Sequence, residues 1–154
     1  MGGVRPALPQ ELDRVAALWT LLAEHHGGSA GFAAAPDAAL SVRDHLAAAL
    51  SHPDAVLLVA EAGGQLIGFG VARVLRRPAL FAETARGEIE ALFVREEARR
   101  SGTGRALARA LLAWLAERGL ARVALHVARG NAEGQAFWRA LGFTDSMDVL
   151  ERPL

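Results

Sequence analysis

The sequence predicts an α+β domain, arranged as a three-layer α/β structure, in which helices flank a mixed and mostly antiparallel sheet. Two β-rich runs meet at a Gly-Gly pair, which is typical of a hairpin, and they follow two segments with helical periodicity. The second half then runs strand, helix, strand, which predicts a β-α-β crossover. Together these patterns predict the element order β-α-α-β-β-β-α-β-α-β.

The bulk composition limits the class of protein. The 154 residues are 52% apolar and 22% charged with a formal net charge of +0, which predicts one globular domain over residues 1–154 and no nucleic-acid partner. The absence of cysteine excludes disulfides, thiolate metal sites and an acyl-cysteine intermediate. Because no apolar run can span a bilayer and no signal pattern opens the chain, we expect a cytoplasmic protein with no membrane partner.

The first half is expected to hold a short strand, two helices and the hairpin. Apolar residues repeat every three to four positions after the first proline-flanked strand, and a glycine-rich loop ends that helix. Asp37 is a plausible N-cap for the second helix. The expected elements are a strand at 3–8, a helix ending near His25 and His26, a helix from Asp37 to Ser51, and strands near 55–61 and 66–75.

The run EIEALFV predicts a further strand over residues 88–94. Side chains alternate between the two faces of a regular strand, so its charged and apolar residues can be assigned to faces. We expect Glu88, Glu90, Leu92 and Val94 on one face, and Ile89, Ala91 and Phe93 on the other.

The crossover helix and the end of the chain follow. The run TGRALARALLAWLAERG has an apolar stripe at helical spacing and stops at Gly119. The run RVALHVA alternates as a strand, a short helix is expected over 131–141, and the tail from about Thr144 is expected to form a last strand. The buried stripe of the long helix comprises Leu107, Leu111, Trp114 and Leu115.

A basic, glycine-rich loop opens the long helix with the sequence RRSGTGR. Unpaired amides at a helix N-terminus bind anions, and Arg99, Arg100 and Arg105 would add charge-assisted bonds to phosphate oxygens. A Walker A loop is excluded because the chain has no lysine, and the dinucleotide pattern is excluded because Leu107 replaces its third glycine. Taken alone, the loop leaves a structural turn and a phosphate site equally open.

The surroundings of this loop resemble the GNAT N-acetyltransferase family. The spacing from Arg99 to Gly104 resembles the family's acyl-CoA loop, and the run Leu92-Phe93-Val94 resembles the strand before it. The segment NAEGQAFWRALGF resembles the family's asparagine, helical aromatic and Leu-Gly-Phe, although Gly134 stands where an alanine is frequent. The resemblance covers about residues 87–143. It implies the acyl-CoA N-acyltransferase fold and acetyl transfer from acetyl-CoA to an amine.

The resemblance also implies where acetyl-CoA binds. The backbone of Leu92 and Val94 would contact the acyl group and pantetheine, and the Leu92 amide would polarise the thioester. The loop amides would hold the pyrophosphate, and Phe137 and Trp138 would border the cofactor or, alternatively, only pack in the core. The implied cofactor-binding residues are Leu92, Phe93, Val94, Arg99, Arg100, Ser101, Gly102, Thr103, Gly104, Arg105, Asn131, Phe137 and Trp138.

Amine acylation requires two proton movements. An ammonium substrate must lose a proton, and Glu88 and Glu90 are the candidate bases or, alternatively, binders of a cationic acceptor. With Leu92 they form the expected catalytic set. Many family members carry a tyrosine acid where Trp138 stands, and the chain has no tyrosine. The thiolate would then take its proton from water, from the ammonium intermediate or from Ser146.

The acceptor is expected to be a primary amine of a small molecule or peptide. His25, His26, Phe32 and Glu88 are the expected substrate-binding residues, although the two histidines could instead only stabilise the end of their helix. His45, like His52, is expected at the surface, and no metal site is expected. The resemblance implies that the chain can form a homodimer. The alternative function is a non-catalytic module that binds acyl-CoA.

Overall fold

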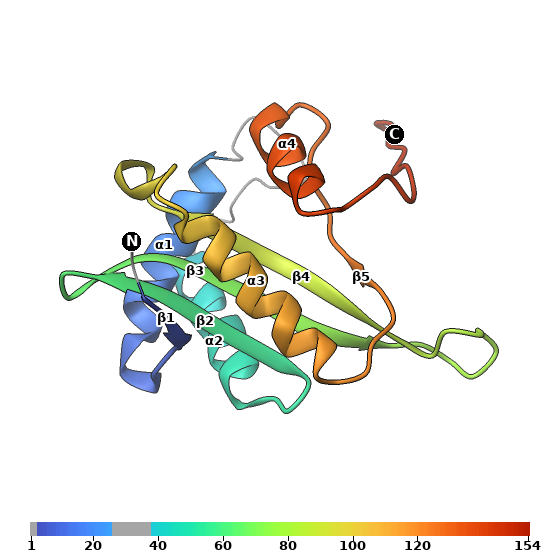
Figure 1. Ribbon diagram of the computed structural model, residues 1–154, viewed down its shortest axis with the longest axis horizontal. Helices are drawn as coiled ribbons and strands as arrows, with labels where there is room; N and C mark the ends of the chain where they lie inside the picture. Colours follow the sequence, from blue (N-terminus) through green and yellow to red (C-terminus); the bar gives the residue numbers. More distant parts are fainter. Residues whose placement is uncertain (1–2, 26–37) are drawn as a thin grey trace.

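The computed structural model describes residues 3–25 and 38–154 (Figure 1). Its sheet has the order β1-β2-β3-β4-β5, antiparallel except for the parallel pair β4–β5. Helices α1 and α2 cover one face of the sheet, and α3 covers the other. The strands are β1 (Gly3–Pro6), β2 (Ala55–Ala62), β3 (Gln65–Arg76), β4 (Ala85–Val94) and β5 (Val123–Ala124); the helices are α1 (Leu12–His25), α2 (Ala38–Ser51), α3 (Thr103–Ala116) and α4 (Ala132–Ala140), with short 3-10 turns η1 (Pro9–Glu11) and η3 (Glu96–Ala98).

The predicted three-layer arrangement of the domain is confirmed. The hairpin turns at Gly63 and Gly64, which both take positive φ. Leu107, Leu111 and Leu115 of α3 are fully buried, as the apolar stripe predicted, whereas Trp114 is only partly buried. The predicted N-cap Asp37 lies outside the described residues. Within the described ranges, no helix is both long and apolar enough to cross a bilayer.

Strand β4 contains a β-bulge at Glu90. Val71 of β3 pairs with Ala91, and the next residue, Ala72, pairs with Ile89, so Glu90 has no partner in the ladder. One extra residue on one strand shifts the alternation of side chains beyond it by one position.

The bulge makes part of the predicted face assignment of β4 wrong. Ile89 belongs with Leu92 and Val94 on the α3 side, while Ala91 and Phe93 pack on the α1–α2 side. Glu88 and Glu90 do share a face, as predicted, but it is not the face of Leu92 and Val94. Glu88 lies opposite Arg73, whose side chain reaches Glu90. A strict period of two could not anticipate this, because the bulge has no marker in the sequence.

The predicted strands at the end of the chain are also wrong in part. The strand expected over 122–128 is reduced to β5, and the tail from Thr144 forms no strand. Its apolar residues Met147, Val149 and Leu150 are exposed. The tail is instead tied to the α4 region by ion pairs, Arg139 with Asp145 at 2.6 Å and Arg129 with Asp148. Because β5 ends at Ala124, the tail has no extended neighbour with which to form a ladder.

A buried carboxylate joins the N-terminal strand to the first helix. Glu11 is 2% exposed, and its Oε1 accepts a bond of 2.6 Å from Arg5 Nη2, while its Oε2 accepts the Leu8 amide at 2.8 Å. Arg5 also bonds Glu61 of β2 at 2.7 Å. The guanidinium of Arg5 lowers the pKa of Glu11 from 4.5 to about 2.

We expect Glu11→Gln to lower the free energy of unfolding at pH 7 by about 2 kcal/mol, because it removes charged hydrogen bonds to a buried group. Since the pKa of Glu11 is lowered on folding, its contribution is present above pH 4.5 and is lost as the pH falls toward 2. Urea unfolding across this range measures the difference. The control Glu61→Gln, at a side chain 36% exposed, should cost less than about 1 kcal/mol. Equal costs for the two variants would contradict this account.

Candidate functional site

The sheet opens between β4 and β5. The two strands pair only at Gly87 with Val123 and at Glu88 with Ala124. Beyond these pairs the chain leaves β5 toward α4, while β4 continues to Val94 (Figure 1). In the described part of the chain, the edge of β4 from Ile89 onward therefore has no strand beside it on this side.

The backbone amides of Leu92 and Val94 face this opening. The Phe93 carbonyl points toward β3, since a Cβ placed on Gly68 would lie 2.7 Å from its oxygen. Peptide groups alternate in direction along a strand, so those of Leu92 and Val94 point to the other side. In agreement, the Val94 carbonyl accepts a 3.0 Å bond from Arg99 Nε rather than from β3. The bulge at Glu90 determines which peptide groups of β4 point toward β3 and which point toward the opening.

The loop between β4 and α3 presents a row of unpaired amide donors. The amide of Ala106 bonds the Gly102 carbonyl at 2.9 Å, but the amides of residues 100–105 donate no hydrogen bond to any described residue. Arg100 and Gly102 have φ values of 60° and 88°, which turn successive amides the same way. The row ends in the positive end of the α3 dipole, an arrangement that favours the binding of an anion.

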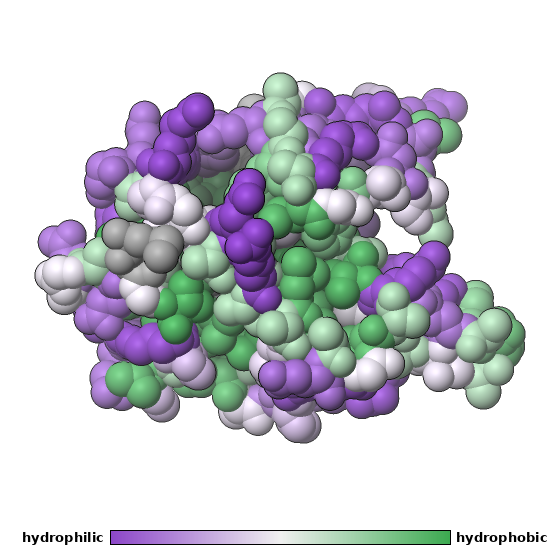
Figure 2. Space-filling view, viewed as in Figure 1, coloured by the Kyte–Doolittle hydropathy of each residue, from purple (hydrophilic) through white to green (hydrophobic). Residues whose placement is uncertain are grey.

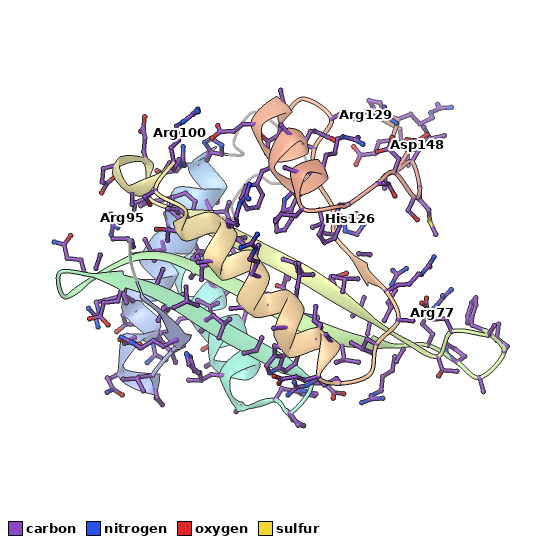
Figure 3. All side chains as sticks on the ribbon, in the orientation of Figure 1. Arg77, Arg95, Arg100, His126, Arg129 and Asp148 are labelled. Atoms are coloured by element: carbon purple, nitrogen blue, oxygen red, sulfur yellow. The ribbon has the colours of Figure 1, made fainter. Side chains whose placement is uncertain are left out.

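Some side chains of the loop hold it in shape, and others are exposed to solvent. The Ser101 hydroxyl bonds the Ala98 carbonyl at 2.6 Å and the hydroxyl of the fully buried Thr103 at 2.8 Å. Arg100 and Arg105 are exposed and make no ion pair within the described ranges, and Figure 3 shows Arg100 on the loop. Both guanidinium groups are therefore available to a bound phosphate.

An apolar surface lies between this loop and the open edge of β4. Figure 2 shows apolar residues between α3 and α4, with hydrophilic side chains around them. Phe137 of α4 lies 3.4 Å from the position that a Cβ of Gly104 would take, so α4 packs against the first turn of α3. The other partly buried apolar side chains in this region are Leu92, Leu125, Trp138 and Phe143.

The residues of the Asn-containing motif hold α4 in place. Asn131 is the N-cap of α4, and its Oδ1 accepts the Gly134 amide at 3.0 Å. Trp138 makes edge-to-face contacts with Phe137 at 4.9 Å and Phe143 at 5.4 Å between ring centres. A Cβ on Gly134 would lie 2.5 Å from Asn131 Nδ2, so an alanine here would require the Asn131 side chain to move.

The two glutamates of β4 differ in whether they have a partner. Glu90 pairs with Arg73 of β3 and bonds His45 of α2. Glu88 is half-buried and makes no hydrogen bond or ion pair with the described residues. Sequence reasoning expected His45 at the surface and did not single out Arg73. A charged residue inside the apolar run of β3 was the available signal.

Of the other expected residues, two are exposed and two lie outside the described ranges. His25 is exposed at the end of α1, and Ser146 is exposed in the tail. His126, which Figure 3 labels, lies exposed on the connection from β5 to α4. His26 and Phe32 are outside the described residues. Within the described chain, no three histidine or acidic residues are grouped as a metal site would require.

Known proteins resemble this chain both in sequence and in structure. A profile described as the acetyltransferase (GNAT) family matches residues 15–143. A mycothiol acetyltransferase of Pseudarthrobacter chlorophenolicus is 35% identical over 131 residues, which are 82% of this chain and 40% of that protein. The chain thus spans less than half the length of this curated relative.

Solved structures share the fold. A variant of the BH1408 protein from Bacillus halodurans superposes with a TM-score of 0.87 at 24% identity, over 99% of both chains. An aminoglycoside N-acetyltransferase in complex with CoA superposes with a TM-score of 0.78 at 21% identity, over 100% of this chain and 95% of that one.

The contact between Asn131 and Gly134 generates a double-mutant prediction. Gly134→Ala alone should leave stability nearly unchanged, because about 1 kcal/mol of helix propensity is offset by about 1 kcal/mol from the displaced cap. In the Asn131→Ala background, where no cap remains, Gly134→Ala should stabilise by about 1 kcal/mol. Urea unfolding of the four proteins measures the coupling. An equal effect of Gly134→Ala in both backgrounds would show that the cap does not select glycine.

Proposed function

The chain belongs to the acetyltransferase (GNAT) family, and from this membership we propose that it transfers an acetyl group from acetyl-CoA to a primary amine of a small molecule or peptide. The observation that carries the proposal is the continuity of the amide row at residues 100–105 with the open edge of β4. An elongated ligand with a pyrophosphate at one end and a carbonyl at the other fits this path.

The loop holds the phosphates of the cosubstrate. Its unpaired amides donate to the pyrophosphate oxygens, and Arg100 and Arg105 add charge-assisted bonds. The pantetheine arm then runs along the edge of β4, where the alternation of peptide groups offers donors and acceptors at Leu92 and Val94. The Leu92 amide donates to the thioester oxygen and stabilises the charge that develops there during attack.

The reaction is direct attack in a ternary complex. The neutral amine attacks the thioester carbon, a tetrahedral oxyanion forms, and the carbon–sulfur bond breaks to release the CoA thiolate. The chain supplies position and an activated carbonyl. Trp138 cannot act as the acid, because an indole N–H is a donor that does not release its proton at neutral pH. Its ring packs between Phe137 and Phe143 instead.

The acceptor is a cationic amine. Glu88 supports this assignment, because its half-buried carboxylate lacks a partner in the described chain and attracts an ammonium group. Glu90 is already paired with Arg73, so it does not bind the acceptor directly. Relatives named for mycothiol and aminoglycosides make aminosugar amines the first class to test.

The direct test combines the purified protein, acetyl-CoA and a panel of amines, with release of CoA thiol as the readout. The panel contains glucosamine, kanamycin, spermidine and a peptide with a free α-amine. We expect thiol release above the rate of hydrolysis with at least one panel amine, and an acetylated product by mass spectrometry. CoA binding without turnover on any amine would instead favour a module that binds acyl-CoA without catalysis.

Gly104→Val should weaken CoA binding by at least about tenfold, or 1.4 kcal/mol. A branched side chain would crowd Phe137 and Val94, whose atoms lie 3.4 Å and 3.6 Å from the Cβ position, and would screen the loop amides. The matched variant Gly104→Ala makes only ordinary contacts and should bind CoA within about threefold of wild type. Calorimetric titration and thermal unfolding separate affinity from stability. Unchanged CoA affinity in Gly104→Val would refute the phosphate loop.

A further inference from the structure

Resting on the proposed acetyl transfer, we propose that His45 of α2 is the base that removes the proton of the acceptor amine, with Glu90 orienting its imidazole. The sequence motifs assign no role to this histidine. The inference comes from a side-chain cluster that four separate elements bring together on the α1–α2 face of the sheet. Its members are His45, Arg73, Glu90 and Trp19.

In this cluster, neighbouring side chains hold the imidazole of His45 in one orientation. Glu90 Oε1 contacts His45 Nε2, and Glu90 Oε2 pairs with Arg73 Nη2. The edge of the Trp19 ring packs against the imidazole, with 5.7 Å between ring centres and an interplanar angle of 72°. Carboxylate and aromatic ring together fix the plane of the imidazole. This is the arrangement in which a carboxylate holds a histidine in one tautomer for proton transfer.

The tautomer follows from which groups can donate. Nε2 lies near both the Glu90 carboxylate, which only accepts when ionised, and Arg73 Nη2, which only donates. The contact to Glu90 is the shorter of the two, so we assign the hydrogen of neutral His45 to Nε2. The other ring nitrogen, Nδ1, then carries a lone pair and forms no hydrogen bond with the described residues. The His45 side chain is 40% exposed, so part of the imidazole is accessible to a ligand.

Position along β4 connects the cluster to the site of attack. Glu90 is two residues before Leu92, a distance of about 7 Å along a strand. The Leu92 amide lies in the plane of the sheet at its open edge, and His45 approaches the same strand from α2. Glu88 is four residues before Leu92, about 13 Å along the strand. An acceptor with two amines can therefore place one ammonium group near Glu88 and present its other nitrogen to His45 and to the thioester carbon.

The charges around His45 agree with this role. The groups that face it are Glu90 from β4 and Arg73 from β3, whose Nη2 lies 3.3 Å from its Nε2, while α1 contributes the uncharged Trp19. Glu88 stands across from Arg73 on the same face, and Asp44 beside His45 on α2 is exposed. An imidazolium formed at His45 would be balanced by Glu90.

The step balances without a further reactant. One N–H bond of the ammonium breaks, and its proton passes to Nδ1 of His45, giving an imidazolium paired with Glu90. The electron pair left on the nitrogen then attacks the thioester carbon. The imidazolium returns its proton to water before the next cycle.

The test measures pH profiles of kcat/KM for His45→Gln with the panel amine that wild type acetylates fastest. We expect a fall of about 10²–10³-fold and loss of the acidic limb that reports the free base. Imidazole added to His45→Ala should restore at least part of the rate. The matched control is His52→Gln, a histidine just beyond the same helix, whose Nδ1 accepts the Asp54 amide at 2.9 Å. Glu88→Gln should instead raise KM and keep the acidic limb.

A weakly basic acceptor separates proton removal from positioning. Methoxyamine is already neutral at pH 7, so its acetylation should fall less than about threefold in His45→Gln if only the base is lost. Equal losses with both acceptors would show a structural role and overturn the proposal, as would a wild-type profile in His45→Gln. Failure of wild type to release CoA thiol with every amine would sink the proposed function as well.

A nitrogen-15 NMR spectrum of the wild-type protein tests the arrangement without turnover. We expect neutral His45 to carry its hydrogen on Nε2 and to lose this preference in Glu90→Gln, while the signals of His52 stay unchanged. A hydrogen on Nδ1 of His45 in the wild type would contradict the assigned base, whatever the activity.

Discussion

The bulge at Glu90 is the constraint on which the proposed site depends. By inserting one residue into β4, it sends the amides of Leu92 and Val94 to the open edge of the sheet instead of toward β3. The same insertion leaves Glu90 outside the ladder, on the face where Arg73 and His45 lie. One local irregularity thus orients the amides proposed to bind the carbonyl and positions the cluster proposed to accept the proton.

The second constraint is the shortness of the parallel pair. Because β4 and β5 are joined only near Gly87 and Glu88, they diverge toward the end of β4, where the glycine-rich loop begins. The loop must turn into α3, which packs on the sheet through Leu107, Leu111 and Leu115. Burial of that apolar stripe fixes the N-terminus of α3 beside the opening, so the amide row and the free edge form one path. The position of the amide row is therefore a consequence of core packing.

Structural features that follow from residue spacing were predictable from the sequence. Features that depend on which strands pair were not. The hairpin, the helical stripe of α3 and the glycine-rich loop follow from spacing alone, and the structure contains all three. The phase of β4 beyond Ile89 was not predictable, because a bulge is set by the partner strand. The tail has the alternation of a strand but no neighbour to pair with. The contact of His45 with Glu90 was not predictable, because helical position says nothing about what a second element brings against a residue.

The absence of a tyrosine does not prevent the proposed reaction, because the departing thiolate can take its proton from the attacking nitrogen. Attack by a neutral primary amine leaves a positively charged nitrogen with two protons in the tetrahedral intermediate, and one of these protons must be released to give the amide. That nitrogen and the departing sulfur are bonded to the same carbon, so the proton can reach the thiolate directly or through one water. A separate acid then adds little, whereas removal of the first proton is indispensable. A residue that packs, such as Trp138, is thus tolerated beside the cofactor, provided that a base stands on the acceptor side.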